Sequence, residues 1–441
     1  MPNTEMQQRV TEREFGLWIC VALVVGNTIG MGIFVLPSSL ASFGWKAIWA
    51  WGLVVAGCLV LARCITHLAR RFPGADSPYD YVRATLGELP AFVAVWSYWV
   101  SVWVTMAMLA VAVVGYLQAS LPGLSEWPPM GLALALVWLL VAVNALGVRS
   151  GGAVQIVTTV LKLLPMLLVM AIGVTSLSSE TGGAAQQVVV SPSGLAPVLA
   201  AGGIVLYAML GFESAAMPAG RVRDPQRIVP LATMLGTVLV GVIYIVVCAV
   251  PLWVLDQSAL GQSEAPFVLL IDQQFGQGSG RWIGLFVIIS GVGALNGWTL
   301  LAGEMARSLA HQRVMPSMVA AENRFRAPWV GLLLVGLLAS IVVLTNYSRG
   351  LVEVFSFLTV VITAASIPFY LFCTLALLRL AQREAAYRRV AIVALAVLGA
   401  LFTLALLAGM GSEPFYLALV LAAAGLPLYF FKRWRLRRTA T

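Results

Sequence analysis

The sequence predicts an all-α integral membrane protein with twelve transmembrane helices, and three observations support this fold class. The 441 residues are 60% hydrophobic and only 10% charged, with a mean hydropathy of +0.93, which excludes an ordinary soluble domain. Apolar runs of about 20 residues, the length that a helix needs to cross a bilayer, recur between short polar stretches. Basic residues gather in alternate loops, as expected when an even number of helices crosses the membrane.

The apolar runs set the limits of the spans. The predicted spans are residues 16–36, 45–68, 90–118, 130–148, 153–177, 195–217, 229–254, 281–309, 328–346, 352–378, 388–410 and 414–431. The first span is too long for the apolar region of a signal peptide, so we expect it to stay in the protein as a signal anchor behind the polar tail 1–15. The polar stretches around 178–194 and 255–280 are predicted outer loops with short helices.

The net charge of +9 is explained by where the basic residues lie. All Lys and Arg residues except Lys46, Arg63, Lys162, Arg281 and Arg349 lie in the N-terminal tail, in or beside the loops after even-numbered spans, or in the tail 432–441. Because Lys and Arg accumulate on the cytoplasmic side of membrane proteins, both termini are predicted to be cytoplasmic. The expected partner is therefore the lipid bilayer, and no nucleic acid partner is predicted.

Few side chains are available for other kinds of function. The five cysteines all fall within apolar spans without a Cys-x-x-Cys pair, and the only histidines, His67 and His311, lie near span ends. Neither a disulfide nor a metal site nor a cofactor is therefore predicted. The spans have too few polar residues to line a channel and lack the groups of an intramembrane enzyme. A non-transporting membrane receptor stays a remote alternative, because the chain has no sizeable soluble domain for signalling.

The first span contains an interruption near its midpoint. Residues 26–32 read Gly-Asn-Thr-Ile-Gly-Met-Gly, and glycine costs about 1 kcal/mol relative to alanine inside a helix, so this segment favours unwound backbone. Within a bilayer, unwound backbone is tolerated only where it is buried in protein or lines a cavity. The break is therefore a predicted binding site.

The sixth span has a comparable interruption at residues 211–214, Gly-Phe-Glu-Ser, with Pro218 beyond it. Spans 1 and 6 hold corresponding positions in two halves of five spans, which is typical of an inverted-repeat transporter with a site near the bilayer midplane. The alternative is that these glycines only let helices pack closely. The matching positions and the carboxylate in the second break favour the functional interpretation.

Three segments carry a family resemblance: VVGNTIGMGIFVLPSSLA (24–41), GFES (211–214) and NGWTLLAGE (296–304). Together they resemble the amino acid/polyamine/organocation superfamily, and most closely its basic amino acid/polyamine antiporter branch. The resemblance implies a leucine-transporter-like fold with broken helices 1 and 6. Its parts would be two inverted repeats of five helices (16–178 and 195–380), two further helices (388–431) and the cytoplasmic tails.

The resemblance also implies where a substrate amino acid binds. Its carboxylate would meet the backbone N–H groups of residues 30–32, at the positive start of the second half of helix 1. Its ammonium would meet carbonyl groups near Asn27, Thr28 and Tyr207. A zwitterion held away from water needs donors at one end and acceptors at the other, and broken helices present both.

Specificity is expected to come from the side-chain pocket, where the sequence departs from the arginine antiporters of this branch. Met106 stands for their helix-3 Asn, Tyr207 for their helix-6 Trp, and Met31 for the Ser between their helix-1 glycines. These replacements favour a neutral substrate side chain. Trp298 matches the middle aromatic gate, with an interfacial tryptophan as the alternative, and Tyr98 matches a helix-3 aromatic that faces the site.

Three ionisable residues lie deep in their spans, so each needs a partner or a role. Lys162 resembles the helix-5 lysine of sodium-independent exchangers and proton-coupled permeases, where the ammonium replaces sodium; the alternative is a structural lysine. Glu213 matches a carboxylate that senses protons or binds cationic substrates, and the alternative is a protonated structural Glu. Glu304 is expected to pair with Arg307, one helical turn away.

These observations predict a secondary active amino acid transporter of a bacterial inner membrane, working by alternating access as a sodium-independent exchanger or a proton-coupled permease. Neutral, aliphatic amino acids are the expected substrates, and a basic amino acid/polyamine antiporter is the alternative. Protons are the candidate coupling ion, and a homodimer is the candidate assembly. The predicted substrate-binding residues are Asn27, Thr28, Gly30, Met31, Gly32, Tyr98, Met106, Tyr207, Leu210 and Trp298, and the coupling and gating residues are Lys162, Glu213 and Trp298.

Overall fold

A computed structural model of the chain describes residues 16–72, 78–147, 152–178, 194–212, 224–312, 314–346, 349–387 and 389–431. Every regular element within these residues is a helix, and none of them is a strand. Lipid explains this choice, because a membrane-embedded segment must pair its own backbone N–H and C=O groups, and a helix does so along its length.

Seven helices are long and apolar enough to cross a membrane. They are α4 (Lys46–Arg71), α6 (Glu88–Ser120), α10 (Pro225–Val254), α13 (Arg281–His311), α15 (Leu351–Arg383), α16 (Val390–Gly409) and α17 (Ser412–Ala423) with its helical continuation to residue 431. Four further apolar helices are shorter over their described side chains: α7 (Pro129–Ala145), α8 (Gly152–Ser178), α9 (Ala196–Met209) and α14 (Trp329–Thr345).

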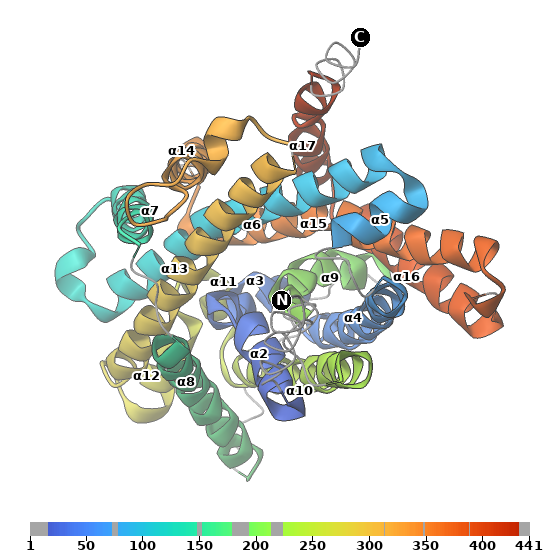
Figure 1. Cartoon of the computed structure of the whole chain (residues 1–441). Coiled ribbons are helices and arrows are strands. Elements are labelled where there is room, and N and C mark those ends of the chain that lie inside the picture. The colour runs from blue at the N-terminus through green and yellow to red at the C-terminus, as the bar shows by residue number, and fades with distance from the viewer. Residues whose placement is uncertain are drawn as a thin grey trace.

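The helices pack in two groups. In the first group, α10 contacts α2 (Leu17–Thr28), α4 and α9, and α4 also contacts α9. In the second group, α6, α7, α13 and α14 all contact one another. The groups are joined by α8, which lies against α10 and α13, and by α15, which lies against α4, α9 and α6. Figure 1 shows α4, α9 and α10 on one side of α6 and α15, and α7 beside α14 on the other.

Helix α6 is the central helix of the molecule. It is hydrophobic all round and buried along nearly its whole length, as expected for a helix that other helices enclose. Two of its indole N–H groups reach neighbouring helices: Trp99 donates to the carbonyl of Ala302 on α13 at 3.1 Å, and Trp96 donates to that of Leu421 on α17 at 3.0 Å. These bonds satisfy polar groups for which lipid offers no partner.

Short helices connect the long ones. They are η1 (Met31–Phe34), α3 (Leu36–Leu40), η2 (Ala41–Phe43), α5 (Pro78–Leu86), η3 (Pro122–Leu124), α11 (Gln257–Gln262), α12 (Pro266–Phe275), η7 (Ser317–Ala320) and η8 (Ala385–Tyr387). The polar stretch 255–280 thus forms two short helices, as predicted. Asp256 begins α11 by accepting a hydrogen bond from the backbone N–H of Ala259 at 3.0 Å, and Gln257 Nε2 donates to the carbonyl of Ala41 in η2.

Candidate functional site

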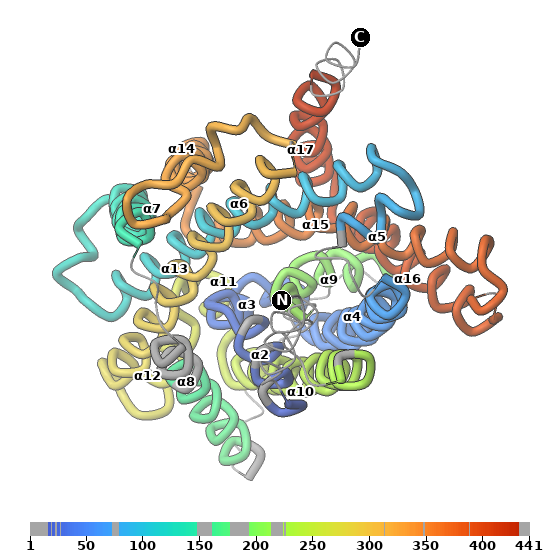
Figure 2. Tube along the Cα trace, viewed as in Figure 1, coloured from blue at the N-terminus to red at the C-terminus, as the bar shows by residue number. Residues whose placement is uncertain are grey.

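The helical segment that begins with α2 is interrupted at the glycines from which the break was predicted. Helix α2 ends at Thr28, and Ile29 (φ −72°, ψ 93°) and Gly30 (φ −102°, ψ −175°) are extended. The chain then turns through η1 into α3. Figure 2 shows this blue trace in the middle of the molecule, beside α9 and α10. Because the first amides of a helical segment have no partner within it, the break brings backbone donors into the protein interior.

Two tyrosines from other helices hold the break in place. On one side, the hydroxyl of Tyr244 on α10 donates a hydrogen bond to the carbonyl of Thr28 at 2.9 Å. Trp51 of α4 packs edge-on against the Tyr244 ring, with ring centroids 5.4 Å apart. On the other side, Tyr116 of α6 donates to the carbonyl of Phe34 at 2.6 Å. Tyr116 and Tyr244 were not among the predicted site residues. The available signal was that a tyrosine within an apolar span needs a partner for its hydroxyl, and an unwound segment supplies free carbonyls.

The end of α9 meets the same break. The ring of Tyr207 lies directly against Gly32, where an added methyl group would overlap its Cε1 atom, so only glycine fits this contact. Tyr207 also packs edge-on against Phe355 of α15, with ring centroids 6.4 Å apart. Helix α9 ends at Met209, Leu210 is extended and buried, and Gly211 has a φ of +105°, a conformation that favours glycine. The structure thus places Tyr207 against Gly32, with Leu210 at the end of the same helix; their role in binding substrate stays a prediction.

The predicted pocket residues Met31 of η1 and Met106 of α6 lie at different positions along the axis of α6. Met31 packs against Gly291 of α13 beside Val113 of α6: a methyl group on Gly291 would lie 2.7 Å from the sulfur of Met31 and 2.6 Å from Val113 Cγ2. Met106 is fully buried two turns earlier on α6, about 10 Å along the helix axis at 1.5 Å per residue. Met31 and Met106 therefore do not meet at one level.

Trp298 lies at the level of Met106. Helices α6 and α13 run antiparallel, since Val113 is beside Gly291 while Trp99 bonds to Ala302. Positions near Met106 therefore face positions near Trp298, which is half-buried against the core. Tyr98 lies about two further turns along α6 from Met106, and its ring packs against that of Phe369 on α15, with ring centroids 4.7 Å apart.

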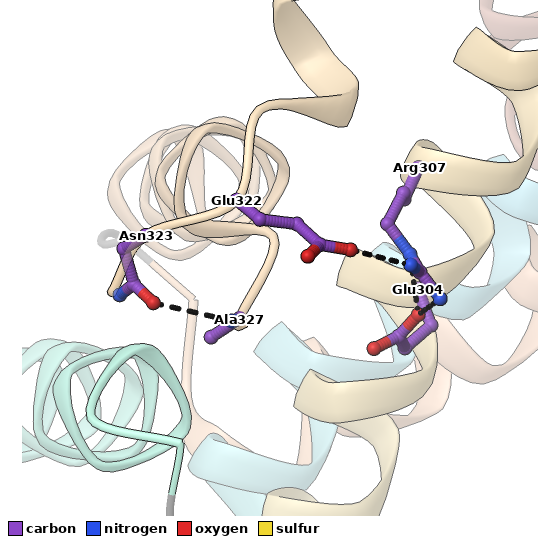
Figure 3. A network of polar contacts seen from close by, with 5 residues as sticks. All are labelled: Glu304, Arg307, Glu322, Asn323 and Ala327. Carbon is purple, nitrogen blue, oxygen red and sulfur yellow. Dashed lines mark hydrogen bonds and ion pairs between the residues drawn. The ribbon is translucent and has the colours of Figure 1, made fainter. Parts of the chain in front are cut away.

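Neighbours of Trp298 in the NGWTLLAGE segment anchor α13 to other elements. Asn296 accepts a hydrogen bond from Asn144 of α7 at 2.8 Å. Glu304 pairs with Arg307 at 2.7 Å, as predicted, and Arg307 also pairs with Glu322 at 2.7 Å. Figure 3 shows Arg307 between the two carboxylates. This network connects α13 to the segment that follows it.

That segment is fastened to α7 as well. Asn323 Nδ2 donates to the carbonyl of Ala145 at 2.5 Å, while its Oδ1 accepts from the backbone N–H of Ala327 at 3.1 Å (Figure 3). The Asn144 to Asn296 bond thus connects α7 with α13, and the Asn323 to Ala145 bond connects α7 with the segment that follows α13.

The two candidate coupling residues are Lys162 and Glu213. Lys162 is only 4% exposed on α8, the helix between α10 and α13, and no acidic side chain of the described residues forms an ion pair with it. Glu213 and the two tails lie outside the described residues. Of Asn27, only the backbone in the last turn of α2 is described. Across the described part of the chain, no three His, Cys, Asp or Glu side chains come together in a way that could hold a metal ion.

The sequence pattern of the amino acid permease family matches residues 15–436. The chain belongs to this family. The permease is therefore a multi-pass membrane transporter and not an enzyme, and the resemblance inferred from its three motifs is confirmed.

Three bacterial antiporters align with most of the permease. It is 30% identical to the cadaverine/lysine antiporter of Escherichia coli strain K12 over 371 residues, which is 82% of each chain. It is 29% identical to a putative arginine/ornithine antiporter of Bacillus subtilis strain 168 over 390 residues, 81% of the permease and 82% of the relative. It is 27% identical to an arginine/ornithine antiporter of Latilactobacillus sakei over 394 residues, 87% of the permease and 80% of the relative.

Proposed function

We propose that the permease is a secondary active antiporter that exchanges a basic amino acid for a related amino acid or amine across a bacterial inner membrane. The observation that carries this proposal is that three relatives, each aligned over about four fifths of its length, are named antiporters of such substrates. This substrate class is the alternative of the sequence analysis, and the relatives favour it over neutral amino acids.

The packing of the helices supports an alternating-access mechanism. The seven long helices, the four shorter ones and the broken segment from α2 to α3 would make twelve spans, with both termini cytoplasmic. Hydrogen bonds between side chains connect the helices of the second group, such as those between Asn144 and Asn296 and between Trp138 and Ser340. We therefore assign α6, α7, α13 and α14 to a rigid scaffold, against which α2, α4, α9 and α10 would rock as a bundle.

The break in helix 1 would bind the common part of the substrate. A methyl group added to Gly30 would meet no atom within 4 Å, so there is room beside this residue for a carboxylate. The amides of residues 30–32 would donate to that carboxylate. Met106 and Trp298 lie about two helical turns from the level of Met31, and this separation suits an elongated ligand with a charged group at each end. Trp298 would close the inner end of the site, and Tyr98 would lie beyond it.

Lys162 and Glu213 are the proposed coupling residues. A buried cation without an ion-pair partner among the described residues is costly in a membrane and is retained where it has a role. Glu213 follows the break after α9, where a carboxylate would attract the cationic end of a basic substrate. Protons are the proposed coupling ion, because Lys162 would take the place of sodium.

Two observations favour a second candidate, a neutral amino acid exchanger. The buried charge of Lys162 would repel a cationic side chain that approached it, and the buried Met106 offers such a side chain only a weakly accepting thioether sulfur. The two candidates differ in substrate class but not in mechanism.

Exchange in proteoliposomes tests the proposal. Vesicles without sodium are loaded with labelled lysine, arginine or leucine, and release is measured on adding lysine, ornithine, cadaverine, agmatine, leucine or methionine outside. Release of the basic substrates by one another, absent from protein-free vesicles, is the expected result. Exchange confined to leucine and methionine would reject the basic class and support the second candidate.

A further inference from the structure

The last turns of α4 carry a basic surface that the transport function does not use. Arg63, His67 and Arg70 follow one another at spacings of four and three residues, so they share one face of the helix. Arg63 and Arg70 are exposed and His67 is half-buried. We call these three residues the α4 basic face.

Helix α16 and η8 border this face. The ring of His67 packs edge-on against Tyr387 of η8, with centroids 6.5 Å apart, and Cys64 Sγ donates to the carbonyl of Leu395 on α16 at 3.7 Å. The next basic residue, Arg71, is already paired with Glu384 at 2.9 Å. Glu384 is thereby engaged, and none of the ion pairs between described residues involves Arg63, His67 or Arg70, so the α4 basic face carries a positive charge.

The members of this face retain unused hydrogen-bond donors. Arg70 donates through Nε to the carbonyl of Gln226 at 2.9 Å, which leaves its terminal nitrogens available. Arg63 forms no ion pair or hydrogen bond with the described residues. Its guanidinium must therefore find a partner outside the described protein.

The depth of Arg63 indicates the kind of partner. Helix α4 has 26 residues, about 39 Å of length, against a hydrocarbon layer of about 30 Å. Arg63 precedes Arg71 by about 12 Å along the axis, a little more than the roughly 9 Å by which α4 exceeds this layer, so with the excess at this end Arg63 would lie just inside the edge of the layer, where its side chain is exposed. An arginine there reaches toward lipid headgroups and bonds to them.

We propose that the α4 basic face binds the phosphate of an anionic phospholipid. A guanidinium pairs with a phosphate through two parallel hydrogen bonds, so Arg63 and Arg70 would hold the headgroup from two sides with His67 between them. The adjoining surface of α16 suits acyl chains, because Leu398 and Leu401 expose more than half of their side chains. A basic pocket between membrane helices is a known form of lipid headgroup site.

Thermal melting of the whole purified permease in detergent tests this site. Phosphatidylglycerol is added to the wild type and to Arg63→Gln, Arg63→Lys and Arg83→Gln, with phosphatidylcholine as the neutral lipid. Arg83 is the matched control, because it is an exposed arginine on α5 outside the basic face. Phosphatidylglycerol should raise the melting temperature of the wild type more than phosphatidylcholine does. This difference should fall by more than half in Arg63→Gln, fall less in Arg63→Lys, and persist in Arg83→Gln.

Three outcomes would overturn the proposal. They are equal effects of the two lipids on the wild type, an Arg63→Gln variant that responds like the wild type, and an equal stabilisation by glycerol 3-phosphate, which has the phosphate but no acyl chains. If Arg63→Gln proves too unstable to purify, lipid that remains bound to Arg70→Gln and to Arg83→Gln is compared by native mass spectrometry. Loss of phosphatidylglycerol in Arg70→Gln alone supports the site, and equal retention contradicts it.

Discussion

Gly30 and Gly32 lie two residues apart in the break, yet a side chain would meet different surroundings at each. At Gly32 it would overlap the ring of Tyr207, whereas at Gly30 it would point into open space. Gly32→Ala is therefore expected to destabilise the permease by about 1–3 kcal/mol, as overpacking does. Gly30→Ala should leave the melting temperature unchanged but slow exchange, because its methyl group would occupy the proposed carboxylate position. Equal melting temperatures for the two variants would contradict this distinction.

Lys162 can be tested by removing its charge. We expect Lys162→Met, which retains apolar volume, to slow exchange by about tenfold or more, as loss of a residue needed in the transport cycle does. Its melting temperature should stay the same or rise, because the variant loses a buried charge that has no ion-pair partner among the described residues. Melting and exchange are measured on the same preparation. Normal turnover in this variant would remove Lys162 from the coupling mechanism.

Glu264, outside the membrane spans, is expected to make the stability of the permease depend on pH. It lies between α11 and α12, with its Cβ and carbonyl oxygen each 3.2 Å from the position of a Cβ on Gly115, and burial raises the pKa of its carboxyl. The folded protein then holds this proton more tightly than the unfolded chain does. Its contribution to stability is greatest below the ordinary carboxyl pKa and declines as pH rises through the raised value. Glu264→Gln should flatten that part of a plot of melting temperature against pH; an unchanged curve would assign it to other groups.

At the scale of elements, the Tyr116 hydroxyl is what ties η1 to α6 by a hydrogen bond. Tyr116→Phe would leave the carbonyl of Phe34 without this donor, and the expected cost is about 1–3 kcal/mol. The structural consequence would be a looser second half of helix 1. Thermal melting measures the effect, with Tyr416→Phe as the control, because Tyr416 is 61% exposed. Equal melting temperatures for the two variants would mean that the bond contributes nothing.

Local sequence predicted the elements better than it predicted their contacts. Apolar runs located the long helices, because crossing a bilayer requires a length that few other segments reach. The pair Gly30 and Gly32 located the break, because glycine is a poor helix former. The partners of Tyr116 and Tyr244 could not be predicted, since the pattern of one helix does not say which neighbour its hydroxyl meets. For the same reason the sequence could not predict that Met31 lies beside Val113 of α6 and not beside Met106.

For the whole molecule, the distribution of basic residues predicts which loops face the cytoplasm. The five cysteines of the chain are buried and form no disulfide bond, so a maleimide should react mainly with a single cysteine added at an exposed position. We expect a membrane-impermeant maleimide, applied to intact cells, to label Glu126→Cys between α6 and α7 but not Met318→Cys in η7. Both positions are exposed, and opening the cells should make Met318→Cys reactive. The reverse pattern would invert the topology.

The enclosed position of α6 has a consequence for synthesis. Its neighbours α13, α15 and α17 follow it in the chain, so α6 enters the bilayer before they have been translated. Because α6 is apolar on all sides, it is stable in lipid before its neighbours are inserted. The indole N–H groups of Trp96 and Trp99 have no carbonyl partner until α17 and α13 are inserted. Assembly is thus completed late, and a chain truncated before α13 would leave in lipid a helix built for protein contacts, a target for membrane quality-control proteases.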